Sequence, residues 1–106
     1  MKLVDRKNPT LPIIPPPVLD FLKKVGKTHQ CIEKICIFGS RARGDNRENS
    51  DVDIAIYGSL SESEQANIFD QIEENDISLL KIDVVFMCDL SDFEFMRRIE
   101  NEGIEI

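Results

Sequence analysis

Three aspartates stand in segments whose other residues are typical of buried strands. Asp51 and Asp53 alternate with apolar residues in the run DVDIAIY, and Asp83 interrupts the run KIDVVFM. Residues two apart in a strand point to the same face, so Asp51 and Asp53 are expected to lie side by side. Carboxylates this close repel each other, and a divalent cation removes the conflict. The pattern therefore indicates a site for magnesium, and two such ions about 4 Å apart are suited to phosphoryl displacement.

The same alternation predicts which face of the strand is buried. Val52, Ile54 and Ile56 share the face opposite the aspartates, and we expect that face to meet the core. The alternative for the acids is an exposed sheet face on which carboxylates simply meet water, as half-solvated sheets allow. That alternative is easier to hold for Asp83 taken alone than for the pair.

A possible phosphate-binding turn precedes the aspartates. Gly39 and Ser40 follow the apolar run KICIF, at the point where a strand is expected to turn into a short helix. Free N–H groups at such a turn attract phosphate, Gly39 lets a ligand come close, and Ser40 adds a hydroxyl. Arg41 and Arg43 could reach phosphate groups as well. A Gly-Ser pair alone has little weight, since small residues are ordinary at turns and arginines are usually solvated; the order of the features carries the argument.

The periodicity of apolar residues predicts the helices and strands around these candidate site residues. The order is helix, strand, short helix, strand, helix, strand, helix, with Ser61–Glu64 and Ser91–Glu94 as capping boxes and Gly103 as a helix end. The expected helices are 16–26, fraying to about 30, then 40–44, 61–75 and 91–103; the expected strands are 34–38, 51–57 and about 80–87. This predicts an α/β (α+β) fold: a small mixed three-stranded sheet with helices packed on one face.

Two regions follow from the distribution of proline. All five prolines fall within residues 1–17, which predicts a proline-rich extended arm, and residues 18–106 form the expected globular domain. No apolar run is long enough to cross a membrane and no secretory leader is visible, so we expect a cytoplasmic protein without a membrane partner. The three cysteines and the single histidine show no disulfide or zinc spacing. The formal net charge of −7 argues against nucleic acid as the main partner.

The stretch FGSRARGDNRENSDVDI resembles the signature of the DNA-polymerase-β-like nucleotidyltransferase superfamily. That signature is a hydrophobic residue and Gly-Ser, a spacer of about this length, and then two acids alternating with hydrophobic residues in a strand. The form FGSRARG…SDxDI is similar to the minimal nucleotidyltransferases (MNT), antitoxins encoded beside HEPN-domain toxins. The resemblance covers nearly the whole chain after residue 17 and implies a polymerase-β-like palm fold.

The resemblance also implies roles for the residues that match it. Gly39 and Ser40 would hold the triphosphate of ATP, Asp51 and Asp53 would bind two Mg²⁺ ions, and Asp83 would complete the metal site and help to activate the attacking hydroxyl. The implied reaction moves AMP from ATP to a hydroxyl, that of a tyrosine, on a partner HEPN toxin in a hetero-oligomer. Two alternatives stay open: a non-catalytic antitoxin that acts by complex formation, and a nucleotidyltransferase that modifies a small molecule.

Overall fold

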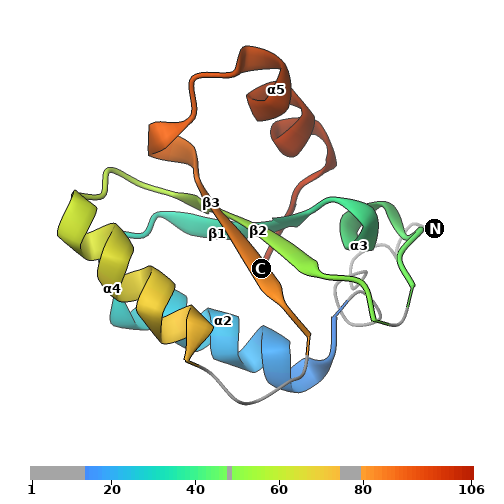
Figure 1. Ribbon diagram of the computed structural model, residues 1–106, viewed down its shortest axis with the longest axis horizontal. Helices are drawn as coiled ribbons and strands as arrows, with labels where there is room; N and C mark the ends of the chain where they lie inside the picture. Colours follow the sequence, from blue (N-terminus) through green and yellow to red (C-terminus); the bar gives the residue numbers. More distant parts are fainter. Residues whose placement is uncertain (1–13, 48, 75–79) are drawn as a thin grey trace.

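A mixed four-stranded sheet forms the centre of the computed structural model, which describes residues 14–47, 49–74 and 80–106 (Figure 1). Its strands are β1 (Lys34–Phe38), β2 (Val52–Tyr57), β3 (Ile82–Phe86) and β4 (Ile104–Glu105), in the spatial order β3-β2-β1-β4. β1 is antiparallel to β2 and to β4, whereas β2 is parallel to β3. The predicted mixed α/β sheet is confirmed; the additional strand β4 has two residues, too few to leave a periodic signal.

Helices cover both faces of the sheet. They are α2 (Pro16–Thr28), α3 (Ser40–Arg43), α4 (Glu62–Glu73) and α5 (Phe93–Glu102), and a 3₁₀ turn, η2 (Met87–Asp89), follows β3. α2 and α4 lie on one face, as predicted, and α4 makes the crossover that the parallel pair β2 and β3 requires (Figure 1). α5 lies on the opposite face instead, where its Phe95 and Ile99 pack with Phe38 and Ala55.

Strand alternation divides the buried side chains into two groups. The larger group, here the main core, lies between the sheet and helices α2 and α4; its buried members are Ile14, Val18, Leu19, Leu22, Val25, Ile32, Ile35, Ile37, Val52, Ile54, Ile56, Leu60, Ile68, Ile72 and Ile82. The smaller group, the α5 cluster, has Phe38, Ala55 and Ile99 as its buried members. The predicted core face of β2 is therefore confirmed, and the aspartate face is the one that α5 partly covers.

The helix ends agree with the sequence at one capping box and differ at the other. Ser61 accepts a hydrogen bond from the Glu64 backbone N–H, and the Glu64 carboxylate accepts one from the Ser61 N–H, which is the predicted capping box. At α5 the predicted cap at Ser91 is wrong, because the Asp92 side chain accepts the hydrogen bond from the Phe95 N–H at 3.1 Å. A carboxylate serves well there, because a helix N-terminus favours negative charge.

The beginning of the chain is only partly described. Residues 1–13 of the predicted arm lie outside the described residues, and the division of the chain at residue 17 stays a prediction. Pro16 and Pro17 form the first turn of α2 rather than an extended segment, since proline is well tolerated where a helix begins. Ile14 is buried in the main core. Across the described ranges, no helix combines the length and apolar character needed to cross a bilayer.

Candidate active site

Two of the predicted acids are neighbours across the sheet. Asp53 in β2 is in register with Asp83 in β3, and the two strands are parallel, so both side chains project from the face that carries α5. Asp53 and Asp83 are both partly buried; the Asp83 side chain is 42% exposed, and Lys81 Nζ lies 3.5 Å from its Oδ1. Asp51 is exposed and precedes the first residue of β2 by one position. The sheet therefore brings Asp53 and Asp83 together and leaves Asp51 at its margin.

Asp53 carries an unfavourable charge. Burial raises the pKa of its carboxyl above the ordinary value of 3.8, and the carboxylates of Asp83 and Asp51 raise it further. The Arg43 guanidinium opposes this rise in pKa, whereas the Glu102 carboxylate adds to it. A cation bound beside Asp53 would reverse the balance, because an opposite charge favours the ionised form of a carboxyl.

The donor set fits magnesium when substrate oxygens complete the coordination. Among the described residues, no group of three or more His, Cys, Asp and Glu side chains is gathered as a ready metal cage. Mg²⁺ does not require such a cage, since it usually takes one or two carboxylates together with water and phosphate oxygens. The adjacent Asp53 and Asp83 meet that requirement. A two-ion site that also uses Asp51 stays a prediction.

Gly39 brings the backbone of the predicted phosphate turn against Asp53. Its φ of 79° lies in the region that side chains disfavour, and a Cβ at this position would collide with the carboxylate of Asp53. Glycine is therefore required for two reasons, the backbone angle and the close approach. The consequence is that the turn from β1 into α3 lies directly beside the acid of β2.

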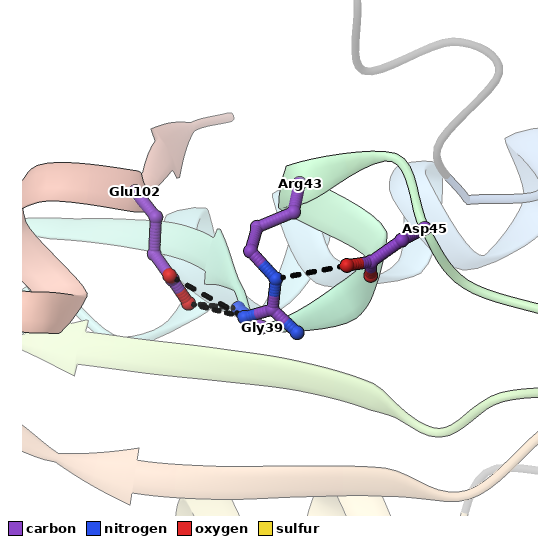
Figure 2. A network of polar contacts seen from close by, with 4 residues as sticks. All are labelled: Gly39, Arg43, Asp45 and Glu102. Atoms are coloured by element: carbon purple, nitrogen blue, oxygen red, sulfur yellow. Dashed lines mark hydrogen bonds and ion pairs between the residues drawn. The ribbon is translucent and has the colours of Figure 1, made fainter.

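A polar network connects this turn with the end of α5 (Figure 2). The Gly39 backbone N–H donates to Glu102 Oε1 at 2.8 Å, and Arg43 Nη1 donates to the same oxygen at 3.2 Å. Arg43 Nε also donates to Asp45 Oδ2 at 3.2 Å, so the guanidinium lies between two carboxylates. The donors expected to bind phosphate thus have acidic partners within the chain.

Gly39, Arg43 and Glu102 border an open cavity of about 440 Å³. Its volume lies in the range of small-molecule binding sites. Its lining consists of Phe38, Gly39, Ser40, Arg43, Asp53, Val85, Phe95, Arg98 and Glu102. Of the predicted site residues, Gly39, Ser40, Arg43 and Asp53 are brought together here. Within the described part of the chain, Arg41, Asp51 and Asp83 do not line it.

Arg41 has a different environment from Arg43 although both belong to α3. Its side chain is 4% exposed, and its Nε and Nη2 donate to the Ser50 carbonyl at 3.1 and 3.0 Å. This contact holds the residue immediately before Asp51. The geometry supports a structural role for Arg41 in the approach to β2, and the nucleotide-binding role predicted for it gains no support here.

Several cavity residues were missed by the sequence argument. Glu102, Phe95 and Arg98 come from α5, and Glu102 is 63 residues away from the glycine that it contacts. Arg98 lies over the Phe95 ring, with its guanidinium carbon 5.7 Å from the ring centroid. No spacing within the predicted motif relates α5 to the Gly-Ser turn. The amphipathic pattern of α5 predicted a helix, and did not indicate which face of the sheet it would cover.

Solved structures of other proteins share this fold. A toxin–antitoxin structure with AMP-PNP matches with a TM-score of 0.64 and 20% identity, over 81% of this chain and 69% of that chain. A variant of the toxin–antitoxin MntA–HpeT matches with a TM-score of 0.65 and 19% identity, over 83% and 70%. A protein from Sulfolobus solfataricus matches with a TM-score of 0.54 and 20% identity, over 84% and 75%. At these identities the likeness shows a common fold.

The sequence itself matches a protein family. No curated protein sequence matches significantly. Residues 21–106, however, match the family model described as Polymerase beta, Nucleotidyltransferase. The matched region contains the Gly-Ser turn, the three aspartates and the whole described sheet, which confirms the resemblance seen in the motif. Because the match extends over most of the chain, this protein belongs to the polymerase beta nucleotidyltransferase family.

Proposed function

We propose that this protein transfers AMP from ATP to a tyrosine hydroxyl of a partner HEPN toxin and thereby acts as its antitoxin. The observation that carries the proposal is the position of Asp53, next to Asp83 across the sheet and against the Gly39 backbone at the wall of the cavity. Membership of the family supports nucleotidyl transfer. The fold shared with toxin–antitoxin structures, one of them with AMP-PNP, supports the choice of nucleotide and partner.

Each residue has a defined task in this reaction. The Gly39 amide, the Ser40 hydroxyl and the Arg43 guanidinium bind the triphosphate, which places the α-phosphorus near Asp53. Asp51, Asp53 and Asp83 would hold Mg²⁺, which neutralises the charge on the phosphate oxygens.

The transfer is a substitution at the α-phosphorus of ATP. The acceptor oxygen forms a bond to the α-phosphorus, and the bond from that phosphorus to the bridging oxygen breaks. Pyrophosphate leaves with the electron pair of the broken bond. Asp83, which is partly open to solvent, accepts the hydroxyl proton and passes it to water.

Transfer of label tests this proposal directly. The protein is incubated with its HEPN partner, Mg²⁺ and ATP labelled at the α-phosphate, and the partner is analysed by autoradiography and intact mass. We expect labelled partner with the wild type and at least a hundredfold less with Asp53→Asn, since removing one electrostatic group typically costs about 10²–10³ in rate. Asp70→Asn is the matched control, because Asp70 is exposed on α4, which covers the other face of the sheet.

The second candidate function is an antitoxin that acts by binding alone. Two observations favour it: the Glu102 carboxylate already accepts the hydrogen bond of the Gly39 amide, and the net charge of −7 suits a basic partner. The two functions differ in their dependence on Asp53. An unlabelled partner, together with full protection of cells by Asp53→Asn, would establish the binding function and reject the transfer.

A further inference from the structure

Glu102 makes the contacts expected of a bound phosphate. Its Oε1 accepts the Gly39 N–H at 2.8 Å, and its two oxygens lie 3.2 and 3.4 Å from Arg43 Nη1 (Figure 2). The Glu102 side chain is 17% exposed, against 47% for Arg43, so the carboxylate is the inner member of the pair. An amide and a guanidinium that converge on one anion form the donor arrangement that phosphate also uses.

The Gly39 amide cannot serve Glu102 and a phosphate at the same time, because it has a single proton. Arg43 donates from Nη1 to Glu102 and from Nε to Asp45, so a phosphate at these two nitrogens would compete with both carboxylates. A phosphate oxygen placed on the Gly39 amide would stand beside the Glu102 carboxylate, and the two negative charges would repel in a partly buried place. The effect of this carboxylate already reaches Asp53, whose pKa it helps to raise.

The position of Glu102 in the chain gives it room to move away. It is the last residue of α5 and precedes Gly103, the C-terminal cap of that helix. A side chain at a helix end can change rotamer without disturbing the hydrogen bonds of the helix interior. The cavity that Glu102 borders is open, so a released carboxylate can turn toward solvent.

We propose that Glu102 is an internal competitor of phosphate, an inference that rests on the proposed nucleotide-binding function of the same cavity. In the nucleotide-free protein its carboxylate occupies the Gly39 amide and Arg43, and the polyphosphate of the nucleotide displaces it. Displacement lowers affinity for every ligand that uses these donors. After the transfer, the returning carboxylate assists the release of pyrophosphate.

Glu102→Gln distinguishes a Glu102 that competes with phosphate from one that supports phosphate binding, because the two roles predict opposite changes in affinity. Glutamine keeps the length of the side chain and an oxygen that can accept from Gly39, and removes the charge that repels phosphate. Isothermal titration with the Mg²⁺ complexes of AMP-PNP and of inorganic tripolyphosphate should show affinity about 3–10-fold tighter than in the wild type for both ligands. Glu100→Gln makes the same change on the exposed part of the same helix and should leave both affinities unchanged.

The possible outcomes distinguish failure of the competition by Glu102 from failure of the proposed nucleotide-binding function. If the wild type binds these ligands and Glu102→Gln binds them equally or more weakly, Glu102 does not compete with phosphate. Its role is then to position Arg43. If neither AMP-PNP nor tripolyphosphate binds to the wild type or to the variant, the nucleotide site is rejected, and the competition by Glu102 is rejected with it. Glu102→Asp withdraws the carboxylate by one carbon and should also tighten binding, which keeps the inference testable if the glutamine variant fails to fold.

Discussion

At the scale of single residues, the candidate site shows an excess of negative charge close to a partly buried backbone turn. Asp53 is placed beside Asp83 and against Gly39, and its carboxyl has a raised pKa through burial and neighbouring acids. Such a group takes up a proton more readily in the folded protein than in the unfolded chain. The arrangement is unfavourable for the protein alone and becomes favourable when a cation is bound, which is the physical mark of a functional site rather than of a stabilising one.

Asp53→Asn should therefore make the protein more stable while abolishing transfer. The folded-state pKa of Asp53 is raised, so its contribution to stability is present below the ordinary value of 3.8 and is lost as the pH rises through the folded value. Thermal unfolding between about pH 4 and about pH 8 should show a higher Tm for Asp53→Asn than for the wild type at the upper end of the range, and a smaller difference at the lower end.

Two controls accompany that measurement. Asp70→Asn removes an exposed carboxylate and should leave the pH profile of the wild type unchanged. Mg²⁺ should raise the Tm of the wild type more than that of Asp53→Asn, because a ligand stabilises the state that binds it. A Tm for Asp53→Asn below that of the wild type at neutral pH would show instead that the carboxylate stabilises the fold.

At the scale of secondary-structure elements, the two arginines of the short helix α3 have different roles. Arg41 points into the protein and holds the Ser50 carbonyl, whereas Arg43 faces the cavity with its guanidinium between Asp45 and Glu102. The first contact fixes the loop that leads into β2, and the second belongs to the site. The helix therefore couples the position of the acids to that of the Gly39-Ser40 turn.

Arg41→Lys should lower the free energy of unfolding by about 1–3 kcal/mol even without nucleotide, because lysine cannot reproduce the two-pronged contact with a partly buried carbonyl. Arg43→Lys changes ion pairs of a solvent-accessible guanidinium and should cost less stability than Arg41→Lys. Urea denaturation of both variants without ligand measures the difference. Equal losses for the two variants would contradict the division of tasks within α3.

At the scale of the whole molecule, the sheet separates a large core from a small one. The main core has α2 and α4 over it, whereas the α5 cluster consists of Phe38, Ala55 and Ile99 with partly buried neighbours. Because the α5 cluster has fewer buried side chains, we expect α5 to have a lower free energy of local opening than α2 and α4. The cavity, which α5 helps to line, would then have the sheet on one side and a more easily opened helix on the other.

Native-state hydrogen exchange should resolve this partition. Ile99→Val and Ile68→Val each shorten a fully buried side chain, and each should destabilise its own core by about 0.5–1.5 kcal/mol. We expect Ile99→Val to speed exchange of the α5 amides through local opening, and Ile68→Val to leave that opening unchanged while lowering global stability. If both variants accelerate exchange of α5 alike, the helix opens only with the whole molecule.

Features that depend on residues close along the chain could be predicted from the sequence. The alternation of Val52, Ile54 and Ile56 predicted the core face of β2, and the Ser61 capping box predicted the start of α4, because both depend on residues that are close along the chain. The motif around Gly39 and Asp53 indicated the family, which the comparison of the whole sequence confirmed.

How distant segments meet depends on the packing of the folded chain. The register that sets Asp53 beside Asp83 depends on the order of the strands. The placement of α5 on the second face brought Glu102 to the Gly39 amide across 63 residues. Side-chain periodicity tells which residues share a face of one element, and it carries no information about which element will cover that face. Packing makes that choice, and here it set an acid of the chain itself in the place predicted for phosphate.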